Sequence, residues 1–321
     1  MIDLETLQEA AALVHRTVPP TPQYCWPLLS RRVGAELWVK HENHTPIGAF
    51  KIRGGLVYLD AVQRSHPSLR GVVTATTGNH GQSIALAAAR LGLEATIVVP
   101  YGNNIGKNRA MEAFGARLVE AGHDFQAAYE HATELARQQE LHFVQSYDPL
   151  LVRGVASYAL ELFDAVPDLD TVYVPIGLGS GISGVIAARE ALGHTAEIVG
   201  VVAANAQTYA LSFAAGAPVS TNSADTMAEG LAVRVSDPAA LDIIRRGAAR
   251  IVTVSEAEIR RAIRILFTDT HNLAEGAGAA PLAAALQERH RLAGKRVAVI
   301  LSGGNIDRAV FAEVLAEEDA E

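Results

Sequence analysis

The chain of 321 residues contains a single cysteine, Cys25, so no disulfide bond can form within it. A chain without internal disulfides is typical of a reducing compartment, and we therefore expect a cytoplasmic location. Aromatic residues make up only 6% of the sequence and charged residues only 19%, whereas 49% of the residues are hydrophobic. That apolar content is sufficient for the cores of about two domains.

The sequence also lacks long apolar stretches and runs of basic residues, which disfavours membranes and nucleic acid as partners. No stretch approaches the roughly 20 apolar residues that a membrane-spanning helix needs. Residues 1–16 carry acidic groups early and have the pattern of an amphipathic helix, not of a secretion signal. The net charge is −8 and no run of basic residues occurs, so nucleic acid and anionic membranes are poor partners. We expect a small-molecule ligand instead.

Short β-branched runs alternate with helical patterns along the whole sequence. The predicted strands are residues 37–39, 71–74, 95–99, 117–119, 172–175, 198–202, 250–254 and 297–301. Helical patterns rich in Ala and Leu lie between them, for example over 82–91 and 181–192. This alternation predicts an α/β fold with two parallel-rich twisted sheets and helices on both faces. Because no long Pro-, Gly- or Ser-rich linker separates the halves, we expect two closely packed domains between which the chain crosses more than once.

One lysine has the surroundings of a nucleophile. Lys51 lies in the segment Gly48-Ala49-Phe50-Lys51-Ile52-Arg53-Gly54-Gly55, directly after a turn and at the start of a predicted helix over 50–62. The positive end of a helix disfavours the ammonium form and lowers the pKa, as an amine nucleophile requires. The alternative is a solvated surface lysine, which the apolar neighbours and the glycines disfavour.

A glycine-dense turn is the second candidate site. Residues 177–184, Gly-Leu-Gly-Ser-Gly-Ile-Ser-Gly, follow the predicted strand and open a helix from about Gly181. Glycines let several amides converge on an anion, and the helix N-terminus adds its dipole. The turn therefore predicts a phosphate site, although an ordinary strand-to-helix turn is the alternative. Residues 179–184 also match the dinucleotide fingerprint, but no acid ends the next strand at 200–205, so NAD is disfavoured.

Two more polar segments follow predicted strands. Residues 76–80, Thr-Thr-Gly-Asn-His, open the helix over 82–91 with hydroxyls and amides that suit a carboxylate. The alternative is an ordinary N-cap made by Thr77 or Asn79. Ser302, in Leu301-Ser302-Gly303-Gly304-Asn305, follows the last strand, and its hydroxyl is expected at the carboxyl edge of a parallel sheet, where ligands of α/β folds bind.

Signals for metal sites and for other nucleophiles are weak. Asp225 and Glu229 are four residues apart, and whether a divalent ion binds there stays open, although a solvated loop is the preferred interpretation. The single cysteine excludes a structural zinc cluster, and no H-E-x-x-H or G-x-S-x-G pattern occurs. We predict no metal. A lysine nucleophile combined with a phosphate site instead indicates a cofactor that carries both an aldehyde and a phosphate, which is pyridoxal 5'-phosphate.

These segments, in this order, resemble those of the fold-type II pyridoxal-phosphate enzymes, most closely the threonine/serine dehydratase and serine racemase branch. The resemblance covers nearly the whole chain. It implies a fold like that of the tryptophan synthase β subunit, with a large cofactor-binding domain of residues 1–68 and 148–321. A small substrate-binding domain would consist of residues 69–147. It also implies a homodimer.

The resemblance implies a role for each candidate residue. Lys51 would hold the cofactor as a Schiff base, and Ser302 would face the pyridine nitrogen. The other cofactor contacts would be Phe50 beside the ring, Asn79 on the ring hydroxyl, and Gly177, Leu178, Gly179, Ser180 and Gly181 around the phosphate. The substrate carboxylate would be held by Thr76, Thr77, Gly78, Asn79 and His80.

The sequence departs from the family pattern at several of these positions. Ala49 replaces the usual serine, and Leu178 and Ser180 interrupt a run of glycines, although the amide donors of that run survive. Thr77 stands where serine racemases carry a serine as a second acid/base, which disfavours racemisation. Glu275 precedes a glycine and not the usual proline, so its role stays open.

The predicted function is a lyase that converts a β-hydroxy-α-amino acid into a 2-oxo acid and ammonia. Lys51 would remove the α-proton. The group that protonates the leaving hydroxyl stays open, with the cofactor phosphate as one candidate. Threonine, serine, 3-hydroxyaspartate and phenylserine share this chemistry, and no basic residue is clearly aimed at a second carboxylate, which favours neutral substrates. The alternatives are a racemase or β-replacement enzyme of the same fold, and a cofactor- or amino-acid-binding protein without turnover, against which Lys51 argues.

Overall fold

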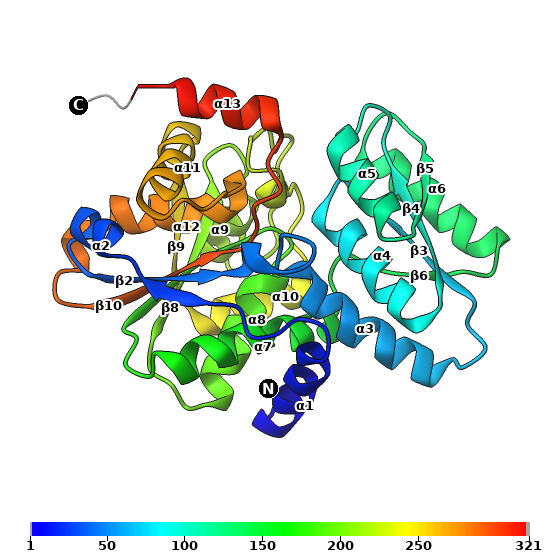
Figure 1. Ribbon diagram of the computed structural model, residues 1–321, viewed down its shortest axis with the longest axis horizontal. Helices are drawn as coiled ribbons and strands as arrows, with labels where there is room; N and C mark the ends of the chain where they lie inside the picture. Colours follow the sequence, from blue (N-terminus) through cyan, green and yellow to red (C-terminus); the bar gives the residue numbers. More distant parts are fainter. Residues whose placement is uncertain (1, 319–321) are drawn as a thin grey trace.

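The structure is a computed structural model that describes residues 2–318 and contains two β-sheets in two lobes (Figure 1). The strands are β1 Gln23–Cys25, β2 Glu36–His41, β3 Gly71–Ala75, β4 Glu94–Val99, β5 Arg117–Glu120, β6 His142–Phe143, β7 Thr171–Pro175, β8 Glu197–Ala203, β9 Ala248–Val254 and β10 Arg296–Leu301. The larger sheet has the order β1-β2-β10-β7-β8-β9, and the smaller has the order β5-β4-β3-β6. All neighbouring strands are parallel except β1 and β2. The predicted α/β fold with two parallel-rich sheets is confirmed.

Helices surround both sheets. They are α1 Leu4–His15, α2 Pro27–Val33, α3 Lys51–Ser65, α4 Asn79–Leu91, α5 Ile105–Ala113, α6 Phe125–Gln138, α7 Pro149–Ala165, α8 Ser180–Ala191, α9 Thr208–Ala215, α10 Pro238–Gly247, α11 Glu256–Thr270, α12 Gly276–Gln287 and α13 Arg308–Ala316. Short 3-10 turns are η1 Glu42–His44, η2 Glu229–Leu231 and η3 Arg289–Arg291. Many helices begin at an Asp, Asn or Ser whose side chain accepts a backbone N–H. Within residues 2–318, no helix is both long and apolar enough to cross a membrane.

The larger sheet separates two hydrophobic cores because side chains alternate between its faces. In β7, Val172 and Val174 pack with the core under α7, α8 and α10, whereas Tyr173 between them packs with the core under α2, α11 and α12. The strand β7 is buried along its full length. Such a strand, covered on both faces, is typical of the centre of a parallel sheet.

Helix α3 belongs to both lobes, and it lies between the two sheets in Figure 1. It packs on α7 beside the larger sheet and on α4 beside the smaller sheet. Glycines permit both close approaches: a Cβ on Gly154 would lie 2.2 Å from the Arg53 carbonyl oxygen, and a Cβ on Gly55 would lie 2.3 Å from Ser83 Oγ. The four strands of the smaller sheet all fall within residues 71–143, but the domain division at 69–147 stays a prediction.

Candidate functional site

The loop that carries Lys51 lies beside the loop that carries Ser302. Ala49 forms an isolated antiparallel bridge with Gly303. The Phe50 amide donates to the Ser302 carbonyl oxygen at 3.0 Å, and the Gly304 amide donates to the Gly48 carbonyl oxygen at 2.9 Å. Two segments from opposite ends of the sequence are therefore fixed together at the carboxyl edge of the larger sheet, directly after β10.

Lys51 is the first residue of α3, and its ammonium lies beside the glycine turn. Its Nζ donates to Ser180 Oγ at 3.4 Å, and Ser180 is the first, buried residue of α8. Burial lowers the pKa of Lys51 to about 8, while the nearby Glu275 carboxylate acts in the opposite direction. The expected lowering of the pKa is thus present, and its main cause in the structure is desolvation, to which the position at the helix start adds.

The glycine turn requires residues without side chains at positions 177 and 179. Gly179 has φ +100°, in the left-handed region, and a Cβ on Gly177 would lie 2.1 Å from the Gly230 carbonyl oxygen. The Tyr209 hydroxyl donates to the Leu178 carbonyl oxygen at 2.8 Å and accepts from the Asp237 amide at 3.0 Å. The turn is therefore rigidly held, and the N-terminus of α8 adds free amides suited to an anion.

The segment over residues 76–80 opens α4, as predicted, but the N-cap alternative is wrong. The N-cap is Gly78, which has no side chain, and the helix begins at Asn79. The Thr76 hydroxyl instead accepts the Gly78 amide at 3.1 Å, which forms the turn. Thr77 is partly exposed. The hydroxyls of this segment thus shape a loop and do not cap the helix, and the first-turn amides stay available for a ligand.

His80, the second residue of α4, is buried without its full set of protein partners. Its Nε2 has no hydrogen-bond partner among residues 2–318. Burial, aided by the positive charge of Lys51, lowers the pKa of His80 to about 3. The imidazole is therefore neutral at ordinary pH. A buried polar nitrogen without a partner is costly in a protein interior, and it indicates a ligand atom or water at this position.

Asn79 connects Glu275 with the loop after β10. Its Nδ2 donates to both Glu275 oxygens, at 2.9 and 3.1 Å, and its Oδ1 accepts from Asn305 Nδ2 at 2.7 Å. Asn305 also donates to the Ile47 carbonyl oxygen at 2.8 Å. Burial raises the pKa of Glu275. Sequence reasoning left Glu275 open and gave Asn305 no role, although Asn305 ends the motif that contains Ser302.

Phe50 and Ser302 complete the surroundings of the lysine. The Phe50 ring packs edge-on against Tyr158 at 6.2 Å between centroids, and Lys51 Nζ lies 5.2 Å from the Phe50 centroid. A Cβ on Gly181 would touch the same Phe50 ring at 3.7 Å. Ser302 is buried and lies directly after β10. The structure thus brings together all the predicted segments around one centre.

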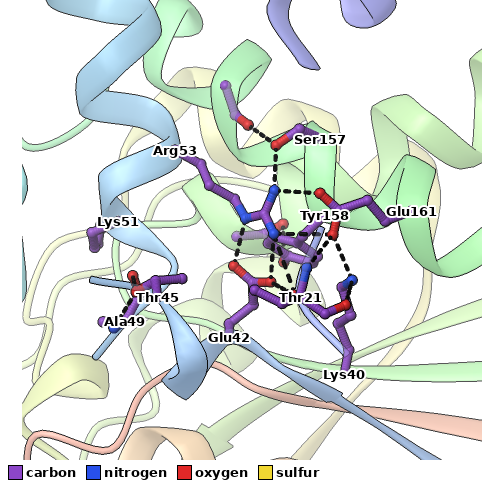
Figure 2. A network of polar contacts seen from close by, with 12 residues as sticks. Thr21, Lys40, Glu42, Thr45, Ala49, Lys51, Arg53, Ser157, Tyr158 and Glu161 are labelled. Carbon is purple, nitrogen blue, oxygen red and sulfur yellow. Dashed lines mark hydrogen bonds and ion pairs between the residues drawn. The ribbon is translucent and has the colours of Figure 1, made fainter. Parts of the chain in front are cut away.

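A buried ionic network lies behind Lys51 and anchors the start of α3 (Figure 2). Arg53 is fully buried and donates to Glu42 at 2.7 Å and to Glu161 of α7 at 2.6 Å. Lys40 of β2 donates to the same Glu161 at 2.6 Å, and Ser157 accepts from Arg53 at 2.9 Å. Two cations face two carboxylates, so each buried charge is compensated. Sequence reasoning did not find this network because its members are far apart along the chain.

A second ion pair crosses between the lobes at the rim of the site. Lys107 of α5 pairs with Glu229 of η2. Glu229 was one half of the acidic pair left open for a divalent ion, and the structure pairs it with a cation instead. Within residues 2–318, no group of three or more His, Cys, Asp or Glu side chains is arranged to hold a metal. No sequence signal pointed to Lys107.

The side chains present fit pyridoxal phosphate. The cofactor needs an amine of low pKa beside an anion-binding turn, and Lys51 lies 3.4 Å from Ser180 of that turn. It needs polar groups along its ring, and the structure supplies the Ser302 hydroxyl and the Asn79 amide. The unpaired nitrogen of buried His80 offers a further contact to a bound ligand.

Comparisons with known proteins agree with this geometry. The family model for pyridoxal-phosphate dependent enzymes matches residues 14–303. An L-threonine ammonia-lyase from Thermotoga maritima is 34% identical over 311 residues, which covers 96% of this chain and 76% of the relative. The processed form of threonine deaminase isoform 2 from Solanum lycopersicum superimposes with a TM-score of 0.91 at 28% identity, covering 99% of this chain and 95% of that chain.

A structure of a pyridoxal 5'-phosphate-dependent aspartate racemase is also similar, with a TM-score of 0.90 and 28% identity over 95% of this chain and 96% of that chain. The fold is therefore shared by enzymes of more than one reaction type. The family match, the threonine ammonia-lyase relative and the threonine deaminase structure agree with the family that the sequence motifs resemble. The chain belongs to the pyridoxal-phosphate dependent enzyme family, in its fold-type II threonine/serine dehydratase branch, and is a pyridoxal phosphate-dependent ammonia-lyase.

Proposed function

We propose that this protein dehydrates and deaminates a β-hydroxy-α-amino acid with an uncharged side chain, threonine or serine, to a 2-oxo acid and ammonia. The observation that carries the proposal is the position of Lys51, with a pKa of about 8, beside the anion-binding turn. An amine with such a pKa is about half neutral at pH 8, and its neutral form can act as a base. The names of the threonine ammonia-lyase relative and the threonine deaminase structure support this substrate class.

Each predicted residue has a role in this proposal. Bound pyridoxal phosphate supplies an electron sink for the substrate's α-carbon. Lys51 holds the cofactor and then takes the α-proton at Nζ. The amides of residues 177–181 hold the phosphate, and the loop over residues 76–80 holds the substrate carboxylate. The neutral imidazole of His80 adds no positive charge beside Lys51, so it does not raise the barrier to proton transfer onto Nζ.

The ring of the cofactor is oriented by Phe50, Asn79 and Ser302 in this proposal. Phe50 would pack beside the ring, and Asn79 would accept from the ring hydroxyl with the second lone pair of its Oδ1. The neutral Ser302 hydroxyl would donate to the pyridine nitrogen and, unlike a carboxylate, would not stabilise a proton on it. The cofactor held in this way would supply a weaker electron sink, which would favour loss of the β-hydroxyl over return of a proton to the α-carbon.

A panel of amino acids tests the proposal. L-Threonine, L-serine, L-threo-3-hydroxyaspartate and phenylserine are incubated with the holoenzyme, and 2-oxo acid is measured. We expect the highest kcat/KM for threonine or serine, and loss of turnover in Lys51→Ala. Release of 2-oxo acid by Lys51→Ala at the wild-type rate would contradict the assignment of the base.

Racemisation is the second candidate reaction, because an aspartate racemase shares the fold. Thr77 stands where a racemase of the branch would carry serine, and this position favours elimination. With L-serine, chiral chromatography should show pyruvate well ahead of D-serine. D-Serine formed faster than pyruvate would identify a racemase.

We also propose a homodimer in the cytoplasm. Tyr24 of the edge strand β1, Leu28 of α2 and Phe267 of α11 expose large apolar side chains. The three elements lie together, because β1 and α2 both pack on β2, and α2 contacts α11. An exposed edge strand beside apolar side chains is suited to association. Light scattering during size-exclusion chromatography should give twice the chain mass of 34.0 kDa, and Leu28→Asp should reduce it to the monomer mass.

A further inference from the structure

The rim of the site carries a charge pair whose placement bears on the substrate's side chain. Lys107 is largely buried, with 12% of its side chain exposed, whereas its partner Glu229 is 57% exposed. The two partners therefore differ in what they lose when the ion pair breaks. The carboxylate can turn into water at little cost, but the ammonium needs a partner where it is.

Lys107 lies against the loop that holds the substrate carboxylate. A Cβ on Gly78 would lie 3.2 Å from Lys107 Cδ and 3.8 Å from its Nζ. Its charge also reaches the site interior, since the pKa of Glu275 responds to both Lys107 and Glu229. The ammonium is therefore adjacent to the loop over residues 76–80 and does not lie on a remote surface.

Glu229 lies on the other wall of the same space. Its neighbour Gly230 places its carbonyl oxygen against Gly177 of the phosphate turn, and Ala228 packs against Gly276 beside Glu275. The pair thus closes the gap between the carboxylate loop of one lobe and the phosphate turn of the other. If a substrate binds with its α-carboxylate on residues 76–80 and its amine near Lys51, the group on its β-carbon would face this gap.

We propose that Glu229 and Lys107 determine the charge of the side chain that the site accepts, an inference that rests on the proposed function. Glu229 neutralises Lys107, so the site takes a β-hydroxy-α-amino acid whose side chain is uncharged. A second carboxylate on the substrate would have to displace Glu229 from Lys107 and would meet its negative charge. Without Glu229, Lys107 becomes a receptor for that second carboxylate.

A second contact between the lobes provides the matched control. Asn104, the N-cap of α5, donates to Asp307, the N-cap of α13, at 2.7 Å. Asp307→Asn removes one negative charge at a contact between the lobes, as Glu229→Gln does, but it leaves the ion-pair partner of Lys107 in place, and Asp307 acts on Lys107 only through its charge, without a direct bond. The Asn that replaces Asp307 can still cap α13. The comparison therefore separates selection by charge from closure of the lobes.

The kinetic test compares L-threonine with L-threo-3-hydroxyaspartate, which differ only in a methyl group or a carboxylate on the β-carbon. In Glu229→Gln holoenzyme, the ratio of kcat/KM for hydroxyaspartate to that for threonine should rise at least tenfold, about 1.4 kcal/mol. In Glu229→Gln/Lys107→Gln the rise should vanish, and in Asp307→Asn, whose charge is not bonded to Lys107, any rise should be much smaller than in Glu229→Gln. Parallel changes for both substrates in Glu229→Gln would overturn the proposal, as would a rise that persists without Lys107.

An equilibrium measurement tests the same idea without turnover. Succinate and butyrate differ by the same replacement of a methyl group by a carboxylate, and calorimetry on the holoenzyme gives both dissociation constants. Glu229→Gln should tighten succinate binding relative to butyrate at least tenfold, and an unchanged ratio would overturn the proposal. If wild-type protein releases no 2-oxo acid from threonine or serine, the proposed function fails, and this binding ratio still decides on the charge pair.

Discussion

The low pKa of Lys51 predicts how the apoenzyme captures its cofactor as the pH changes. Only the neutral amine attacks an aldehyde, so the capture rate follows the neutral fraction of Lys51. With a pKa of about 8, about one amine in eleven is neutral at pH 7. For the ordinary value of 10.5, the fraction is about one in three thousand. The structure therefore gives Lys51 an advantage of roughly 300-fold over a solvated lysine at this pH.

The assay is stopped-flow absorbance after pyridoxal phosphate is mixed with apoenzyme between pH 6 and 10. We expect the rate to rise about tenfold per pH unit and to level off near pH 8. The variant Glu275→Gln changes the pKa of Lys51, because the wild-type Glu275 carboxylate favours the charged form of Lys51. Without that charge the pKa of Lys51 should fall further, so the midpoint should move to lower pH and the rate at pH 7 should increase.

The experiment tests two separate effects on the pKa of Lys51, namely burial and the charge of Glu275. Gln at position 275 can still accept the Asn79 hydrogen bond, so the loop should be preserved. Glu313→Gln, on the exposed face of α13, is the matched control and should leave the profile unchanged. A wild-type midpoint at pH 10 or above would refute the effect of burial on Lys51. A midpoint that is the same in Glu275→Gln would refute the electrostatic contact with Glu275.

Three further predictions follow from the geometry. Gly179→Asp should weaken cofactor binding at least 100-fold in calorimetry, because φ at this position is +100° and the new carboxylate would face the phosphate. Tight binding of NAD by the wild-type protein would contradict the assignment of the turn to a phosphate. Arg53→Met should lower the free energy of unfolding, measured in urea, by about 3–5 kcal/mol, since it leaves the buried carboxylates of Glu42 and Glu161 without the Arg53 cation. A loss below about 1 kcal/mol would show that the network does not stabilise the fold. Ser302→Asp should keep the fold and bind cofactor but slow 2-oxo acid release at least tenfold, about 1.4 kcal/mol of barrier, and an unchanged rate would remove Ser302 from the pyridine nitrogen.

Much of the fold could be predicted because most of its strands are short β-branched runs that alternate with helical patterns. All eight predicted runs are strands in the structure. The strands β1 and β6 were not predicted. They have three and two residues, and they lie at the edges of their sheets, where pairing with a neighbour determines the conformation more than residue type does.

The site could be predicted only as far as its motifs are contiguous. Lys51, the glycine turn, the loop over 76–80 and Ser302 each follow a turn or strand end that the sequence marks. Arg53 pairs with Glu161, and Lys107 pairs with Glu229, and the partners are more than 100 residues apart in the sequence. A single sequence carries no signal for such pairs. The N-cap alternative for Thr77 or Asn79 failed for a related reason: the loop conformation is determined by the Thr76 hydroxyl and by packing, which override local capping preference.

The position of α3 has a mechanical consequence for Lys51. A helix packed tightly on both lobes is the natural axis about which one lobe rotates relative to the other, because points on an axis are displaced least. Lys51 lies at the N-terminal end of α3, on that axis, whereas Lys107 lies off the axis, on α5. A small rotation of the smaller sheet would therefore separate Lys107 from Glu229 and open the entrance, while the nucleophile kept its distance to the phosphate turn.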